Sequence, residues 1–233
     1  MKVTLLNHSE NPERMVALAA RVCYDKEGDI EKIVETLTPE NVDKFVKHML
    51  SLPQHGTPFE SPVFTFGIEG ISRSCSHQLV RHRIASIDQR SQRYCNEAMF
   101  DYVTPNSIAN NEEAKDIFDK TMNVIQASYD TLTTKYNIPK EDARAVLPNA
   151  CCTSLVLTMN LRSLYHFFNL RCCTRCQSEL REVAYRMLVL CKEVSPLLFS
   201  KAGASCDTLG YCPEGKMTCG RKPTLDKLGV KNG

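Results

Sequence analysis

Apolar residues recur at the helical period in several stretches of the chain. Residues 10–24 form one such stretch, with Met15 and Val22 on the predicted apolar face. Thr38-Pro39 predicts the start of a second helix, because threonine caps helix N-termini and proline suits the first turn. Longer amphipathic patterns predict helices over residues 110–136, 160–172 and 174–193.

Two shorter segments predict strands. In VFTFGIEG the side chains alternate, which places Phe64, Phe66 and Ile68 on one face. CCTSLVLTM, residues 151–159, is apolar and β-branched, as in a buried strand. Helices and strands mix along the chain without a repeat or a linker, so we predict a single α+β domain.

Composition and charge exclude several classes of protein. A hydrophobic content of 42% is enough for a sizeable core, and the net charge of +2 argues against a general polyanion-binding protein. The N-terminal segment has too short an apolar stretch for a signal peptide, and no apolar run reaches the length of a membrane span. We therefore expect a cytoplasmic protein with no membrane partner.

The twelve cysteines fit free thiols in a reducing cytosol better than a disulfide framework, since some are adjacent pairs such as Cys172-Cys173. In the tail, Cys206, Cys212 and Cys219 lack the C-x-x-C spacing of a zinc site, so we expect no metal. Cys173 and Cys176 have that spacing, but on a predicted helix they read as two core-facing thiols.

Lysine and arginine are segregated along the chain. No lysine lies between Lys47 and Lys115 or between Lys140 and Lys192, and eleven of the 14 arginines fall in these two segments. Arginine without lysine indicates bidentate recognition of phosphate or carboxylate, or stacking on a flat ring. We infer anion-binding pockets, with structural ion pairs as the alternative for any single arginine.

The first arginine segment is RHRIASIDQRSQRY, residues 81–94. If residues 72–83 are helical, Gln78, Arg81 and His82 share one face. The residues that follow lose helical regularity, and a loop there could surround an anion with backbone N–H groups and Ser91. A nucleic-acid loop is the alternative, although the segment offers only Tyr94 for stacking and the net charge is low.

The second segment contains NLRSLYHFFNLR, residues 160–171. Arg162, His166 and Asn169 fall on one helical face, and apolar residues cover nearly everything else, so we predict a buried helix. For His166 alone, a hydrogen-bonded core histidine is the simpler interpretation. Arg171 lies nine residues past Arg162 and is half a turn out of phase. Either the helix ends near Leu170, or the two arginines serve different ligands or different pockets.

Several segments together resemble the flavin-dependent thymidylate synthases. Arg81-His82-Arg83, followed by seven residues and Ser91, has the form of that family's RHR-x7-S signature. Further similar blocks occur in family order over about residues 1–200: AARVCY, HGTPFE, FTFGIEGISRSCSHQLVRHRIAS, SQRY, ARAVLP and MNLRSLYHFFNLR. The resemblance implies a family domain over residues 1–200, which leaves residues 201–233 as an irregular, cysteine-rich tail.

The resemblance also implies an architecture and an activity. It implies a central, mostly antiparallel sheet flanked by helices, and a homotetramer with active sites between subunits. The implied reaction is FAD-dependent reductive methylation of dUMP to dTMP, with 5,10-methylenetetrahydrofolate as one-carbon donor and NADPH as reductant. No protein nucleophile is expected, because Ser91 has no evident base and no Cys–His arrangement stands out.

By position, the resemblance implies two sets of ligand residues and a catalytic role for Arg171, which would polarise the uracil. The residues expected at FAD are His55, Thr57, Glu60, Arg81, His82, Arg83, Gln89, Asn160, Arg162 and His166. The residues expected at dUMP are Gln78, Arg81, Gln89, Arg90, Ser91, Arg93, Arg144 and Arg171. Gln89 stands where a glutamate is frequent in the family, and Cys23 where some members have a serine near FAD.

Overall fold

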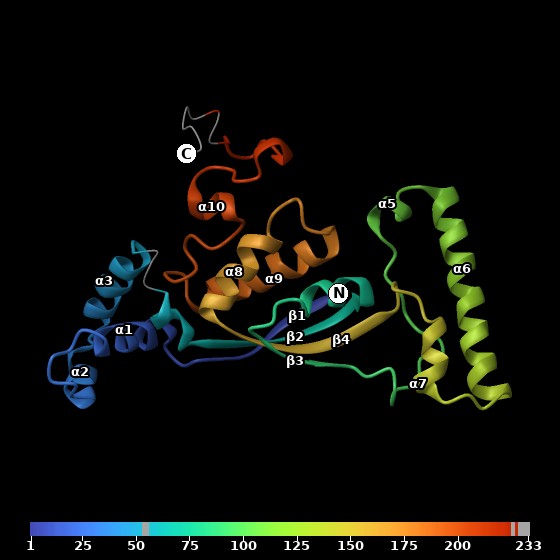
Figure 1. The fold of residues 1–233 in the computed structure, drawn as a ribbon, viewed down its shortest axis with the longest axis horizontal. Coiled ribbons are helices and arrows are strands. Elements are labelled where there is room, and N and C mark those ends of the chain that lie inside the picture. The colour runs from blue at the N-terminus through green and yellow to red at the C-terminus, as the bar shows by residue number, and fades with distance from the viewer. Residues whose placement is uncertain (53–55, 225–226, 228–233) are drawn as a thin grey trace. The chain divides into compact units, whose positions relative to one another are not determined.

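The computed structural model describes residues 1–52, 56–224 and 227 (Figure 1). The chain divides into two compact units. Unit 1 comprises residues 1–2, 67–83 and 87–157, and unit 2 comprises residues 3–66, 84–86 and 158–233. Each strand of the sheet contributes residues to both units, and the tail after residue 200 belongs to unit 2.

The sheet has four strands in the order β1-β2-β4-β3. Their bounds are β1 Lys2–His8, β2 Val63–Ser72, β3 Ser86–Gln89 and β4 Cys152–Asn160. The backbone N–H of Ser9 donates to the Val63 carbonyl at 2.9 Å, and that of Leu161 donates to Pro62 at 2.9 Å. These pairings join the end of one strand to the start of the next, which confirms the predicted antiparallel sheet.

The predicted alternation in β2 is confirmed, because Phe64, Phe66 and Ile68 have no exposed area. Near the end of the strand, Gly70 has a φ of +67°, and a Cβ there would lie 3.2 Å from the backbone nitrogen of Met1. Only glycine adopts this conformation without strain beside another backbone. The prediction for β4 was wrong in one respect, since Val156 is 40% exposed and the strand alternates in burial.

Unit 2 contains most of the helices. They are α1 Pro12–Val22, α2 Ile30–Thr36, α3 Pro39–Leu50, α8 Leu161–Arg171, α9 Ser178–Val194 and α10 Ser205–Leu209, with 3-10 turns at Thr57–Glu60 and Gly215–Met217. Thr38 caps α3 as predicted, its hydroxyl accepting from Asn41 N–H at 3.4 Å. The predicted face of α1 was wrong, because Met15 and Val22 are exposed while the small residues Val16 and Ala20 face the core.

The core of unit 2 gathers aromatic rings around Phe199, which follows α9. Phe199 packs edge-on against Phe64, Tyr165 and Phe168, with ring centroids 5.4 to 6.1 Å apart. Tyr165 also donates a hydrogen bond to the Leu198 carbonyl at 2.7 Å. These contacts join α8 and the segment after α9 to strand β2.

Unit 1 has a second, smaller core. Its helices are α4 Arg73–Leu79, α5 Asn106–Ala109, α6 Glu112–Asp130 and α7 Lys140–Ala143; a π-helical turn at Thr131–Lys135 continues α6, and a 3-10 turn at Arg144–Val146 follows α7. Phe100, Met122 and Cys151 form the buried cluster, with Phe118 packed against it. Among the described residues, no helix combines the length and the apolar character that a membrane span requires.

The helices predicted at 160–172 and 174–193 are confirmed as α8 and α9, but they are separated by a turn at residues 172–177. Cys173 and Cys176 therefore lie in this turn and not on a helix, contrary to the prediction. The backbone N–H of Cys176 donates to the Cys173 carbonyl at 3.0 Å, which closes the turn. Cys176 is buried, as expected, whereas Cys173 is half-buried.

Candidate functional site

In unit 2, α8 presents a polar face made by Arg162, His166 and Asn169, as their spacing predicted. The helix starts at Asn160, whose side-chain oxygen accepts from Ser163 N–H at 2.8 Å. The helix is not buried all round, since Arg162 and His166 are exposed. Neither side chain is therefore a core residue, and the interpretation of His166 as a core histidine was wrong.

Arg162 forms an ion pair with Glu60, with the two side chains 58% and 45% exposed. Ion pairs this exposed contribute little to stability, so the guanidinium is available to a ligand. Behind it, a Cβ added at Gly56 would lie 3.1 Å from Arg162 Nε. Gly56 thus allows the guanidinium to lie close to the backbone of the preceding loop.

A cavity of about 300 Å³ lies beside this arginine. Arg162 and Asn169 supply its polar side from α8, and Leu50, Phe59 and Tyr165 are among its apolar walls. Sites that bind a flat ring commonly have apolar walls and a few polar groups at the rim, such as a planar guanidinium.

Of the other residues predicted at FAD in this part of the chain, Thr57 is exposed at the start of the 3-10 turn at Thr57–Glu60, and Glu60 ends that turn. Asn160 uses its oxygen as the helix cap, which leaves its amide N–H groups for a ligand. His55 lies outside the described residues. Cys23 is exposed at the end of α1, where its thiol donates to the Ala19 carbonyl at 3.4 Å.

Arg171 is the last residue of α8, and the helix runs regularly from Leu161 to Arg171. The helix thus ends one residue after Leu170, close to the end that the first alternative predicted, but it still includes Arg171, so Arg162 and Arg171 lie on opposite faces of it. Arg171 interacts with the thiol of Cys176. Burial raises the pKa of Cys176, and the charge and hydrogen bond of Arg171 oppose that shift.

In unit 1, the Arg81-His82-Arg83 triplet follows α4, which ends at Leu79 and not at residue 83. A turn continues the chain, with the His82 N–H donating to the Leu79 carbonyl at 3.1 Å. Arg81 and Arg83 are exposed and His82 is half-buried. The predicted helical face of Gln78, Arg81 and His82 is thus only partly formed, because the helix is one turn shorter.

Strand β3 occupies four residues of the loop predicted after Arg83, and residues 90–94, which include Ser91, remain outside the strand. At its end, Gln89 donates to the hydroxyls of Ser76 at 2.9 Å and Thr153 at 3.2 Å. These two bonds fix its side chain and occupy the amide nitrogen. Only the carbonyl oxygen of this amide is left for either ligand.

Arg90 is held by a buried carboxylate. Its guanidinium lies 2.6 Å from Glu97, whose side chain is only 4% exposed. The hydrogen bond to Glu97 raises the pKa of Arg90 further above its ordinary value. Tyr129 is fully buried and its hydroxyl accepts from the Glu97 N–H at 3.3 Å. This arginine therefore has a structural ion pair, the alternative that the sequence left open.

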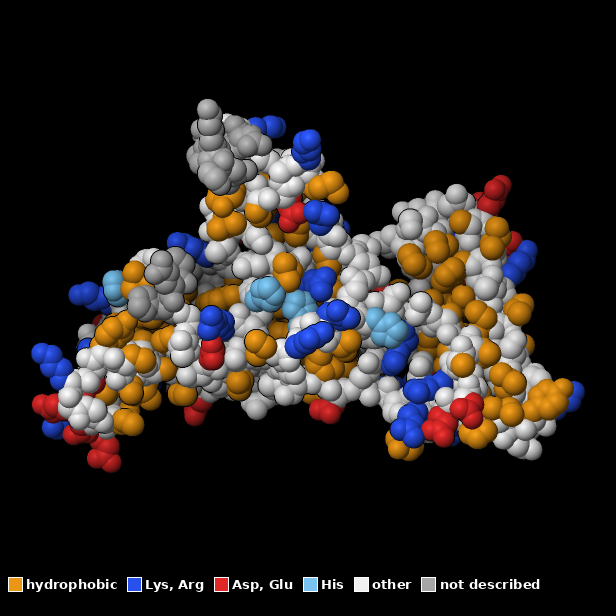
Figure 2. Space-filling view, viewed as in Figure 1, with side chains coloured by type: hydrophobic (Ala, Val, Ile, Leu, Met, Phe, Trp, Pro, Cys, Tyr) orange, Lys and Arg blue, Asp and Glu red, His pale blue; other side chains and the backbone are white. Residues whose placement is uncertain are grey.

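Ser91 and Arg93 form a short turn in which the Ser91 hydroxyl accepts from the Arg93 N–H at 3.2 Å. The Arg93 side chain pairs with Glu141 of α7 at 2.9 Å, and both side chains are about half exposed. Figure 2 shows acidic and basic side chains gathered next to this helix. An anion could compete with Glu141 for this exposed guanidinium, unlike the buried pair of Arg90.

Arg144 lines an open groove of about 380 Å³ in unit 1. The groove is polar and includes three residues that the sequence did not single out, Arg73, His77 and Gln92. Arg73 and His77 lie four residues apart in α4, and that spacing within the lysine-free segment was a usable signal. The groove thus combines two arginines and a histidine with the carboxylate of Glu141, and its cationic groups suit a phosphate or a polar ring.

The structure places the predicted residues in two groups. Unit 2 contains Thr57, Glu60, Asn160, Arg162, His166 and Arg171, and unit 1 contains Gln78, Arg81, His82, Arg83, Gln89, Arg90, Ser91, Arg93 and Arg144. Within the described part of the chain, no group of three His, Cys, Asp or Glu side chains has a geometry that could hold a metal ion.

Known proteins match this chain along nearly its whole length. The family model described as "Thymidylate synthase complementing protein" matches residues 4–197. A flavin-dependent thymidylate synthase of Geobacter sulfurreducens is 47% identical over 230 residues, covering 98% of this chain and 97% of that protein. A protein of the same name from Clostridium tetani is 44% identical over 243 residues, covering 98% and 96%.

Solved structures show the same fold. A flavin-dependent thymidylate synthase from Helicobacter pylori, complexed with FAD and dUMP, superposes with a TM-score of 0.69 at 22% identity, covering 87% of this chain and 100% of that chain. A UMP/dUMP methylase from Streptomyces cacaoi, bound with 5-Br dUMP, also gives 0.69 at 22% identity, covering 85% and 93%. At this identity the structural likeness speaks for the fold alone.

Proposed function

This chain belongs to the flavin-dependent thymidylate synthase family, and we propose that it converts dUMP to dTMP by FAD-dependent reductive methylation. The one-carbon donor is 5,10-methylenetetrahydrofolate and the reductant is NADPH. The observation that carries the proposal is the match, over 98% of the chain, to relatives named for this activity. The geometry of the two groups of residues described above is compatible with it.

The residues of unit 2 fit a flavin. Arg162, Asn169 and the apolar walls of the 300 Å³ cavity offer a flat, partly apolar site with hydrogen-bond donors at its rim. In the proposal, further hydrogen-bond donors to FAD come from Thr57, Asn160, His166 and His55. The set of FAD residues is completed by Arg81, His82 and Arg83. When bound, FAD supplies the redox chemistry, while the protein binds and orients the reactants.

The residues of unit 1 fit a nucleotide. Arg144 lines the polar groove, and the exposed guanidinium of Arg93 and the hydroxyl of Ser91 lie in one turn. A phosphate with two negative charges prefers such planar, bidentate donors. In the proposal Gln78, Arg81, Gln89 and Arg90 complete the dUMP site, with Arg90 held in place by Glu97.

Arg171 has a separate role in the proposal. It is the catalytic residue, and its guanidinium stabilises the negative charge that develops on the uracil ring. No protein nucleophile takes part. Burial raises the pKa of Cys151 to about 11 and that of Cys172 to about 12, so these thiols remain protonated and are poor nucleophiles at neutral pH.

We propose that the protein is a cytoplasmic homotetramer in which different subunits contribute to one active site. The supporting observation is that the residues assigned to each ligand come from both units of the chain. Residues 1–200 would form the family domain, and residues 201–233 its cysteine-rich tail. Both assignments extend the family membership and can be tested separately.

An absorbance spectrum of the purified protein tests the proposed function. We expect flavin absorption that bleaches on addition of NADPH, at a rate that responds to dUMP, and formation of dTMP only when methylenetetrahydrofolate is present. Omission of dUMP serves as the matched control. A colourless protein that cannot be loaded with FAD would contradict the proposal.

A further inference from the structure

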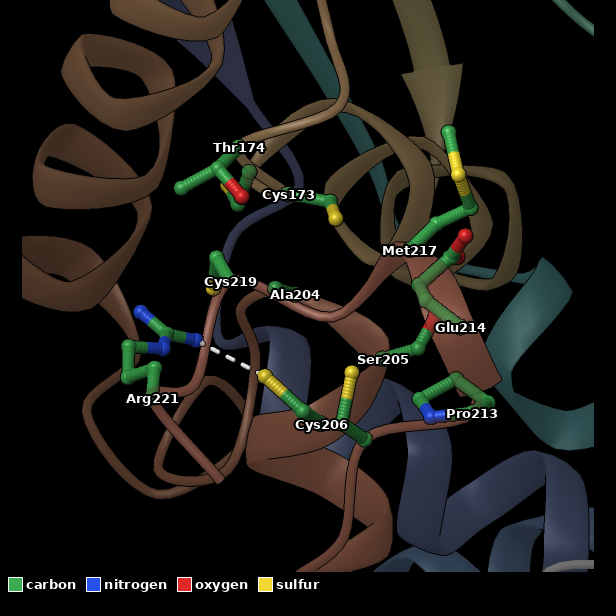
Figure 3. A pocket seen from close by; sticks show the side chains of 12 residues that line it. Cys173, Thr174, Ala204, Ser205, Cys206, Pro213, Glu214, Met217, Cys219 and Arg221 are labelled. Atoms are coloured by element: carbon green, nitrogen blue, oxygen red, sulfur yellow. Dashed lines mark hydrogen bonds between the residues drawn. The ribbon is translucent and has the colours of Figure 1, made fainter. Parts of the chain in front are cut away.

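Five cysteines surround one small hollow in unit 2, away from the polar face of α8. The residues that line it include Cys172, Cys173, Cys206, Cys212 and Cys219. Figure 3 shows Cys173, Cys206 and Cys219 around it, from the α8–α9 turn, from α10 and from the segment after residue 217. These segments are far apart in the sequence, so the gathering of thiols is a product of the tail folding back.

The hollow is too small for a cofactor. Its volume is about 20 Å³, which is room for about one water molecule. A metal is not supported either, because the described residues contain no group of three potential ligands with suitable geometry. What remains is the chemistry of the thiols themselves.

The five thiols differ in exposure. Cys172, Cys206 and Cys212 are buried, and burial raises the pKa of Cys172 to about 12. Cys173 is half-buried, and Cys219 is exposed. Two hydrogen bonds lower the pKa of Cys219. The larger effect comes from the Thr174 hydroxyl and the smaller one from the Arg221 backbone. Exposed thiols that are stabilised as thiolates are the ones that react with oxidants.

Arg221 connects this exposed thiol to a buried one. Its backbone interacts with Cys219, and its guanidinium donates to the sulfur of Cys206 at 3.1 Å, as drawn in Figure 3. The same guanidinium donates to Asp207 at 2.6 Å, which fixes its position. One residue therefore holds Cys206 and Cys219 on the same side of the hollow and orients both sulfur atoms.

We propose that this hollow is a thiol redox site, in which Cys219 reacts with a hydroperoxide and Cys206 resolves the product to a disulfide. The Cys219 thiolate attacks the peroxide, an S–O bond forms as the O–O bond breaks, and Cys219 becomes a sulfenic acid. The departing alkoxide, or hydroxide when the peroxide is hydrogen peroxide, takes a proton from water and leaves hydroxide behind. The Cys206 sulfur then attacks the sulfenic sulfur, an S–S bond forms as the S–O bond breaks, and the departing oxygen takes the Cys206 thiol proton and leaves as water. Two thiols lose two electrons in total, and the hydroperoxide gains them.

None of the five cysteines belongs to the proposed FAD or dUMP sites, and the proposed thiol oxidation does not depend on the proposed function. Its reaction can be measured by mass without any substrate of the enzyme. Trypsin separates residues 202–216, which contain Cys206 and Cys212, from residues 217–221, which contain Cys219. A disulfide between Cys219 and either of the other two keeps these peptides together until a reductant is added.

The test treats the full-length, reduced protein with hydrogen peroxide, blocks the remaining thiols and digests without reduction. We expect the two peptides to be linked in the wild-type protein and in Cys212→Ser, and unlinked in Cys206→Ser and Cys219→Ser. In Cys206→Ser, Cys219 should accumulate as a sulfenic acid that dimedone traps. Cys212 is the matched control, because it is a buried cysteine of the same hollow and the same peptide.

Cys23 provides a second control, since it is the other exposed cysteine among the described residues. We expect Cys219 to react with peroxide at least about tenfold faster than Cys23. If Cys206→Ser fails to fold, fragmentation of the linked wild-type peptides still shows whether Cys206 or Cys212 is bridged. A link that survives in Cys206→Ser, a bridge to any other cysteine, or an unreactive Cys219 would overturn the proposal.

Discussion

The two arginines on either side of Ser91 show how burial of the carboxylate separates a fixed ion pair from an exchangeable one. Arg90 pairs with Glu97, whose side chain is 4% exposed, and Arg93 pairs with Glu141, whose side chain is 49% exposed. A buried carboxylate without its partner retains its desolvation cost, whereas an exposed one is solvated by water. The first pair therefore stabilises unit 1, and the second pair leaves Arg93 free to change partners.

Substitution of the two glutamates tests this difference. Glu97→Gln removes a buried charge partner, and we expect a loss of about 1–3 kcal/mol in the free energy of unfolding, together with weaker dUMP binding because Arg90 is less well held. Glu141→Gln is the matched control, with an expected loss below about 1 kcal/mol. Urea unfolding and dUMP titration measure both effects; equal losses for the two variants would contradict the assignment.

Arg171 differs from Arg162, the other arginine of α8, because it faces away from the cavity-lining side of the helix. We expect Arg171→Ala to retain bound FAD and to lose turnover by about 10²–10³-fold, the typical cost of removing one electrostatic donor from a transition state. Arg162→Ala is the comparison, in which flavin occupancy should fall first. The flavin spectrum and the rate of dTMP formation distinguish them; loss of flavin in Arg171→Ala would place that arginine at the cofactor.

At the scale of elements, α8 is the helix that connects stability with the proposed flavin site. Asn160 caps it through its side-chain oxygen and, in the proposal, binds FAD through its amide nitrogen. The helix is held in place by Phe167 and Phe168, which are fully buried on its opposite face. A change at Asn160 can therefore act through the helix, through the ligand, or through both.

Two substitutions at Asn160 separate these effects. Asn160→Asp keeps the cap acceptor but removes the N–H donors, so we expect an unchanged melting temperature and roughly tenfold weaker FAD binding. Asn160→Ala removes both, and should also cost about 1 kcal/mol of stability. Thermal unfolding of the apoprotein and FAD titration measure the two quantities. Equal FAD affinity in Asn160→Asp and the wild type would show that this residue is only a helix cap.

At the scale of the whole molecule, the two units carry different parts of the proposed site. Arg144 lies in unit 1 and Arg162 in unit 2. If one active site combines unit 1 of one subunit with unit 2 of another, a tetramer that mixes two defective chains contains some sites with no defect. This property distinguishes shared sites from sites within a single chain.

Co-expression of differently tagged Arg144→Ala and Arg162→Ala chains tests the sharing. Each variant alone should have little turnover, and mixed tetramers should recover about a quarter of the wild-type activity, as random assortment requires. A mixture of Arg162→Ala with Glu60→Ala is the control, because both defects lie in unit 2 and no intact site can form. Absence of recovery in the first mixture, despite mixed tetramers, would argue for sites within one chain.

Local patterns in the sequence determined the elements whose burial follows a simple period. The alternation of Phe64, Phe66 and Ile68 in β2, the cap at Thr38 and the extent of α8 depend on neighbours in the sequence, and all three predictions are confirmed. The motif blocks likewise sufficed for the family, because a match of many segments in order does not require coordinates. The roles of the individual site residues stay predictions.

Only the tertiary structure decided which charges are paired and which thiols line the same hollow. The sequence could not distinguish Arg90, paired with buried Glu97, from Arg93, paired with exposed Glu141, because exposure depends on the packing of distant segments. For the same reason, the presence of Cys206, Cys219 and the turn after α8 around one hollow has no local signal. Periodicity shows which face of an element is apolar, but contacts between distant segments decide which chemistry the polar groups can perform.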